Sequence, residues 1–102
     1  MLNIKTLLEM PENPSIPLLL VEKTGGGYAN KLYTASIVVQ SYGNTLYDAA
    51  VLNKKVVSAM MNAASNVDTV IRCNLNSDYN FTDTSTKRYR YQALFDIYYY
   101  EN

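Results

Sequence analysis

The first half of the chain contains two stretches whose hydrophobic and polar positions are typical of β-strands. Residues 16–22 (IPLLLVE) form a short apolar run, and residues 32–41 alternate between apolar and polar side chains, as a half-buried strand does. The connection at residues 24–31 (TGGGYANK) includes the glycines of 25–27 and suits a hairpin loop. We therefore predict an antiparallel pair of strands joined by a flexible glycine loop.

The next stretch repeats its apolar residues every three or four positions, as a helix with one buried face does. Tyr42 and Gly43 are expected to end the preceding strand, and Thr45 with Asp48 three residues later predicts the helix N-cap. The helix is expected to continue to about Ala64. Its predicted apolar face consists of Leu46, Ala49, Ala50, Val56, Val57, Met60 and Met61.

The last third of the chain predicts two more strands separated by a polar segment. Residues 67–73 form a brief third strand, and residues 74–87, rich in Asn, Asp, Ser and Thr, are expected to be a long mobile loop that orders on assembly. Residues 88–100 alternate clearly, with Tyr89, Tyr91 and Tyr99 predicted to face inward and Arg88 and Arg90 outward. Phe95 is expected to pack against the helix.

Before the first strand, residues 2–10 suit a short helical turn, and residues 11–15, which include two prolines, are expected to be a linker. No stretch has the length of a membrane-spanning helix or the pattern of a signal peptide. The order of elements predicts a single α+β domain over residues 1–102. We expect two layers: a mostly antiparallel four-stranded sheet, one main helix on one face, and the short N-terminal helical piece.

The composition of the chain argues against several classes of function. The chain has nine basic and nine acidic residues and no His, while ten Tyr and eleven Asn supply much of its polar surface. A neutral chain lacks the positive field that drives binding to nucleic acid or anionic membranes. Without His, and without a nucleophile motif, we predict no catalytic residues, no metal and no cofactor, so the protein is not expected to be an enzyme. An interaction or assembly protein fits this composition better.

Three local motifs suggest chemistry but lack the residues that would complete it. The glycines of 25–27 are not followed by the Lys-Ser or Lys-Thr of a phosphate-binding loop. Oxygen-bearing side chains alternate from Asn74 to Thr82, but the central Gly and distal Glu of a calcium loop are missing. Cys73 is expected to be a small buried apolar residue.

Four aromatic residues are the candidate contacts for partner proteins. Tyr79 and Phe81 lie in the predicted polar loop, one residue apart, and would share a side if that segment were extended. Tyr98 and Tyr100 alternate with the predicted core positions of the last strand. We expect subunits to associate through these weakly charged surfaces.

Three segments, taken in order, carry a resemblance to a known family. They are residues 21–26 (VEKTGG), residues 37–43 (IVVQSYG) running into Thr45, and residues 90–92 (RYQ). Together they resemble the tail terminator proteins of long-tailed bacteriophages, small proteins also described as tail completion or minor capsid proteins. The likeness extends over residues 16–100, although the ten residues before the first proline are fewer than the N-terminal helix of this family needs.

The resemblance implies an α+β subunit that assembles as a ring, typically a hexamer, on the head-proximal end of the tail tube. Its partners would be further copies of itself, the major tail protein and the head connector proteins. It would form in the bacterial cytoplasm and remain in the virion, in the tail or neck. The alternatives are a head completion or connector protein of the same particle, and a small non-viral binding module, which would need a concave apolar pocket.

Overall fold

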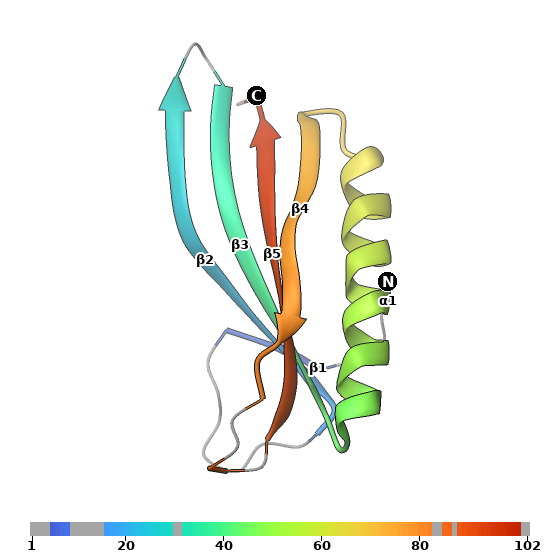
Figure 1. The fold of residues 1–102 in the computed structure, drawn as a ribbon. Helices are drawn as coiled ribbons and strands as arrows, with labels where there is room; N and C mark the ends of the chain where they lie inside the picture. Colours follow the sequence, from blue (N-terminus) through green and yellow to red (C-terminus); the bar gives the residue numbers. More distant parts are fainter. Residues whose placement is uncertain (1–4, 9–15, 30–31, 83–84, 87, 101–102) are drawn as a thin grey trace.

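The computed structural model describes residues 5–8, 16–29, 32–82, 85–86 and 88–100. It is elongated, with principal extents of 44 × 22 × 21 Å, and contains one helix and five strands (Figure 1). The elements in chain order are β1 (Lys5–Leu7), β2 (Leu18–Ala29), β3 (Leu32–Gly43), α1 (Leu46–Ser65), β4 (Val70–Asn80) and β5 (Tyr89–Tyr99).

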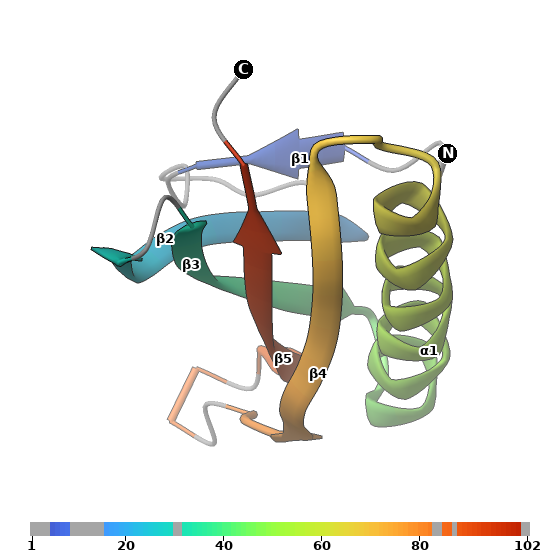
Figure 2. The same cartoon turned by 90° about the horizontal axis from the view of Figure 1, so that it is seen from above.

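The strands form one sheet in the order β1-β2-β3-β5-β4. β1 pairs with β2 in parallel, and the other three pairs are antiparallel. α1 packs against β3, β5 and β4 on one face and lies beside β4 in both ribbon views (Figures 1 and 2). The predicted α+β class is confirmed, and the sheet is mostly antiparallel as expected, but it has five strands, one of them paired in parallel, so the predicted number of four strands is wrong.

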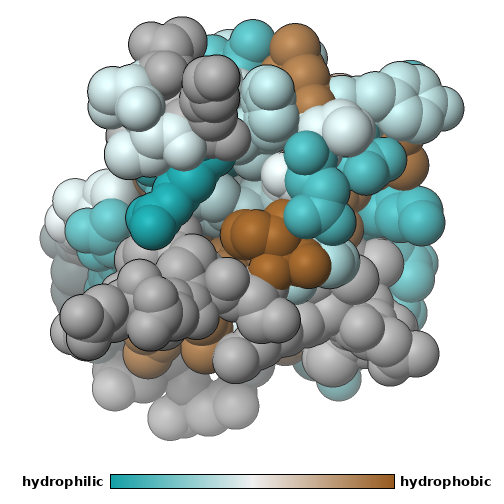
Figure 3. Space-filling view, turned by 90° about the horizontal axis from the view of Figure 1, so that it is seen from below, coloured by the Kyte–Doolittle hydropathy of each residue, from teal (hydrophilic) through white to brown (hydrophobic). Residues whose placement is uncertain are grey.

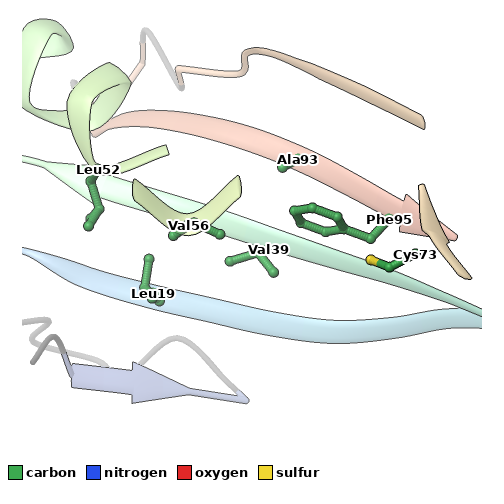
Figure 4. Packing of buried hydrophobic residues seen from close by; sticks show 7 residues of the cluster. All are labelled: Leu19, Val39, Leu52, Val56, Cys73, Ala93 and Phe95. Atoms are coloured by element: carbon green, nitrogen blue, oxygen red, sulfur yellow. The ribbon is translucent and has the colours of Figure 1, made fainter. Parts of the chain in front are cut away.

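The core lies between α1 and the central strands. Phe95 and Ala93 of β5 are fully buried and meet Val56 of the helix and Val39 of β3 (Figure 4). The remaining members of this cluster are Leu19, Leu52 and Cys73. Because these residues come from β2, β3, β4, β5 and α1, one small cluster joins most of the fold. The predicted packing of Phe95 against the helix is confirmed.

The helix begins where its sequence predicts. The Oγ1 atom of Thr45 accepts a hydrogen bond from the backbone N–H of Asp48 at 3.1 Å, and the Asp48 carboxylate lies in the positively polarised first turn. The predicted apolar face is correct at Ala49 and Val56, which are buried, but wrong at two positions, Leu46 and Met61, which are exposed. Buried positions that the sequence pattern missed are Leu52 and Asn53.

The N-terminal prediction is wrong where it can be compared. Within residues 2–10, the described residues Lys5–Leu7 form β1 and pair with Leu18–Leu20 of β2. An isolated segment as short as residues 2–10 gains little from local helical hydrogen bonds, whereas an existing strand edge offers partners to the backbone groups of Lys5–Leu7. The predicted linker at residues 11–15 lies outside the described residues.

The strands also extend into both segments that were expected to be loops. β2 continues through Gly25, Gly26 and Gly27 to Ala29, so the predicted glycine loop is wrong. β4 begins at Val70 and includes residues 74–80, so this part of the predicted mobile loop is wrong as well. In both cases, pairing with a long neighbouring strand outweighs weak local propensity, since each backbone group on the paired side gains a partner. β3 likewise reaches Gly43, two residues beyond its predicted end.

Candidate assembly surface

Two of the four candidate aromatics lie together where β4 ends. The rings of Tyr79 and Phe81 meet edge to face, with centroids 5.7 Å apart, and both side chains remain over two-fifths exposed. The Arg90 guanidinium lies 4.4 Å from the centre of the Phe81 ring, and its Nε donates to the Phe81 carbonyl oxygen. These contacts join the aromatic pair to Arg90 of β5 and define an exposed aromatic patch.

A chain of hydrogen bonds fixes Tyr79 from the sheet side. On the face away from α1, Arg90 donates to the Tyr42 hydroxyl at 2.9 Å, and Tyr42 donates to Gln40 at 3.0 Å. Gln40 donates to Gln92 at 2.8 Å, and Gln92 donates to the Tyr79 hydroxyl at 2.6 Å. These hydrogen bonds span β3, β5 and β4, so polar contacts join the strands on the face opposite α1, where the described residues form no helix.

The other two candidates lie at the far end of β5. Tyr98 pairs with Thr34 and carries the Arg72 guanidinium 4.5 Å from its ring centre. Tyr100 follows the end of the strand, its backbone N–H donates to Thr69 at 2.8 Å, and its side chain is 54% exposed. Five strand residues lie between Tyr98 and Gln92, which pairs with Tyr79, so the structure does not bring the four candidates together.

A row of stacked tyrosines, absent from the sequence prediction, crosses three strands near the free end of the hairpin. Tyr28 of β2 stacks on Tyr33 of β3 with ring centroids 4.4 Å apart, and Tyr33 stacks on Tyr99 of β5 at 5.4 Å. We call these three residues the tyrosine ladder. It lies on the helix side of the sheet, since Tyr99 follows Phe95 and Ile97 at alternate positions. The free face of its outermost ring belongs to Tyr28, which is 56% exposed.

The ladder follows from where the hairpin turns. Ala29 pairs with Leu32, so Tyr28 and Tyr33 are directly opposite and share one face. Placing the turn in the glycines made this pairing invisible, because Tyr28 was then assigned to the loop. Had the turn been predicted between Ala29 and Leu32, the sequence would have placed Tyr28 opposite Tyr33.

The remaining surface is mixed in character. Seen from the end that carries the helix N-terminus, hydrophilic and intermediate residues surround a small hydrophobic area (Figure 3). A shallow depression of about 520 Å³ lies on the exposed side of α1, lined by Lys54, Lys55, Ser58, Ala59 and Asn62. Lying open along one helix, it does not form the concave apolar pocket that a small-molecule site needs.

Chemically reactive groups are few on the part of the chain that the structure describes. Burial raises the pKa of the Cys73 thiol above its ordinary value of 9.0, and the charge of Asp96 raises it further, so this thiol is a poor nucleophile at neutral pH. Across the described ranges, no cluster of acidic residues and Cys could hold a metal ion. Among the same residues, α1 is not apolar enough to cross a membrane.

Comparisons with known proteins add no relative. A scan against protein-family models found no match, and a search of the curated proteins found no significant match. The class of protein therefore has to be argued from the fold, the exposed aromatic surfaces and the sequence segments described above.

Proposed function

We propose that this protein is a structural assembly subunit, specifically a tail terminator of a long-tailed bacteriophage. In this role it caps the head-proximal end of the tail tube and offers the surface on which the head connector docks. The observation that carries the proposal is the surface itself: exposed aromatic residues near both ends of β5, in a chain with no net charge. Tyrosines that combine apolar area with a hydroxyl group are enriched at protein interfaces.

The arrangement of these aromatics supports contacts on two sides. Tyr79 and Phe81 form a patch at one end of β5, while Tyr98 and Tyr100 lie at the other. A subunit in a neck ring needs separate contacts for its neighbours and for the tube, and two separated patches supply them. The α+β architecture, with one helix on one face of a sheet, also agrees with the fold that the family resemblance implies.

The proposal is tested by mixing the purified protein with phage tail tubes and imaging the tubes by negative-stain microscopy. A ring of density at one end only is the expected result. Density at the head vertex instead would favour the head completion or connector role, and binding to neither particle would contradict both viral functions. The gene order supplies an independent check, because a terminator gene lies between the connector and major tail genes.

Matched variants assign the surfaces. Replacing Tyr79 and Phe81 by Ser, or Tyr98 and Tyr100 by Ser, should each reduce capped tubes while leaving the monomer folded. Tyr47→Ser is the control, because Tyr47 is 76% exposed on the first turn of α1 and belongs to neither patch. Equal loss of capping in the control would show that aromatic content in general, and not these patches, promotes binding.

A further inference from the structure

One edge of the sheet has a long section that no described strand covers. β1 pairs only with Leu18–Leu20 of β2, so on that side residues Val21–Ala29 have no strand beside them among the described residues. Backbone N–H and C=O groups along such an edge form a template for another strand. At the opposite side of the sheet, α1 lies beside β4 (Figures 1 and 2).

Two glycines on this edge, Gly25 and Gly27, have no steric explanation inside the chain, whereas a Cβ on Gly26 would lie 3.1 Å from the Thr34 backbone oxygen. Gly25 and Gly27 do not need positive φ, because no described glycine has it. A Cβ built on Gly25 would make only an ordinary contact with the Ser36 Cβ at 4.0 Å, and one on Gly27 would meet the rotatable Thr34 hydroxyl at 3.1 Å. Glycine weakens a strand and is typical of places where another backbone comes close. These two glycines therefore suit an approach from outside the chain.

An irregularity between Lys23 and Gly25 makes the edge complementary to itself. Before it, Lys23 faces the helix side of the sheet, as Ile37 opposite it does, and Glu22 faces the other side. After it, Gly26 and Tyr28 face the helix side, while Gly25 and Gly27 face away. In two antiparallel copies of this edge, residues before the irregularity can lie opposite residues after it. Their side chains then point to the same face of the sheet only if the two residue numbers sum to an odd value.

We propose that the free edge of β2 pairs antiparallel with the same edge of a second copy of this chain, about a twofold axis between Thr24 and Gly25. In this register Glu22 lies opposite Gly27 of the second copy, and Lys23 lies opposite its Gly26. Each long side chain then faces a glycine, and like charges are never directly opposite. The Tyr28 ring covers Val21 of the second copy, which extends the tyrosine ladder across the interface.

The pairing ends at Val21, where β1 occupies the edge. About eight residues from each copy take part, fewer than the roughly 20–30 residues a side of a standard stable interface. The dimer is therefore weak and depends on protein concentration. The inference does not rest on the proposed tail function, because it concerns the free subunit and is tested without tail tubes.

A disulfide test determines the register. In the doubly substituted Glu22→Cys, Gly27→Cys chain, the two thiols of one copy are five strand positions, about 17 Å, apart, too far to bridge. Across the twofold axis they lie directly opposite, so oxidation should give a covalent dimer. Either single variant should form no covalent dimer, because identical residues of the two copies are then separated by the same five positions. Cross-linking by a single variant, or none by the double variant, would overturn the register.

A charge test uses two variants with long side chains of opposite charge at one site. Gly27→Glu places a carboxylate opposite Glu22 of the second copy and should weaken the dimer several-fold relative to Gly27→Lys, which places an ammonium group there. The dissociation constants, measured by sedimentation equilibrium, should converge at high salt because the pair is exposed. Unfolding curves of the two dilute variants establish that both are folded. Identical constants at low salt, or a wild-type chain that remains monomeric up to millimolar concentration, would refute the self-pairing.

Discussion

The two ends of the β2–β3 pair show how differently one sheet can be held together. At the helix-covered end, Leu19 and Val39 are buried against α1. At the free end, the residues of β2 from Glu22 to Ala29 are all exposed, and the strands are joined by their ladder and the tyrosine ladder. The covered end is stabilised by apolar burial, which scales with area removed from water. The free end depends on local cross-strand contacts, which are individually weaker.

The largest expected effect compares two aromatic truncations in the same strand. Phe95→Ala removes a fully buried ring beneath α1 and should lower the free energy of unfolding by about 3–5 kcal/mol. Tyr99→Ala removes a half-buried ring of the tyrosine ladder and should cost about 1–2 kcal/mol. Urea denaturation measures both. Equal losses would mean that the ladder end is as tightly packed as the core.

The sequence predicted some of the elements that form the two ends of the sheet and missed others. The helix and its cap were predicted because Thr45, Asp48 and the apolar spacing act locally. β5 was predicted because its alternation reflects burial of one face. β1 and the second half of β4 were missed, since their residues have weak strand propensity and become strands only by pairing with β2 and β5.

The candidate surface was predicted only in part for a related reason. The exposure of Tyr79, Phe81 and Tyr100 follows from position and polarity of neighbours. The tyrosine ladder and the hydrogen bonds from Arg90 to Tyr79 depend on strand register, which a single sequence does not specify once a turn is misplaced. Asn53 was missed because a polar residue on an apolar helix face breaks the pattern by which that face is found.

A second substitution tests how closely the helix packs on the covered end. A Cβ at Gly43 would overlap the backbone nitrogen of Ala49 and lie 2.9 Å from the Asp48 carbonyl carbon. Gly43→Ala therefore forces the first turn of α1 away from β3 and should lower the free energy of unfolding by about 1–3 kcal/mol. Thermal unfolding followed by circular dichroism measures the loss. An unchanged melting temperature would show that the helix start can shift freely.

The buried amide of α1 offers a third test. Asn53 is 2% exposed, and its Nδ2 donates to the Asp78 carboxylate of β4 at 2.9 Å. Asn53→Ala removes this link between helix and strand and should cost about 1–2 kcal/mol in urea denaturation. Asn62→Ala is the matched control on the exposed side of α1 and should change stability by less than about 0.5 kcal/mol. Similar values for the two variants would contradict a structural role for the Asn53–Asp78 pair.

The covered end should also respond to alkaline pH. Burial first, and then the charge of Asp96, raise the pKa of the Cys73 thiol in the folded chain above 9.0, its ordinary value. Because the folded state favours the neutral thiol, this contribution to stability is complete below pH 9 and is lost as pH rises through the folded pKa. Wild type should therefore lose stability above pH 9 more steeply than Cys73→Ala. Parallel pH profiles of the two proteins would contradict the assigned burial.

The smallest effect, and the one of opposite sign, belongs to the free end. Gly25→Ala places a methyl group on a strand whose glycines have negative φ, with the Ser36 Cβ 4.0 Å away as the nearest atom. The substitution restricts the unfolded chain without a clash in the folded one, so the free energy of unfolding should rise by up to about 1 kcal/mol. Urea denaturation at low protein concentration measures the monomer alone. Gly43→Ala makes the same chemical change but should lower the free energy of unfolding. Changes of opposite sign at the two glycines would therefore distinguish a packed end of the sheet from an open one. A loss at Gly25 as large as that at Gly43 would mean that the free edge is already covered within the monomer.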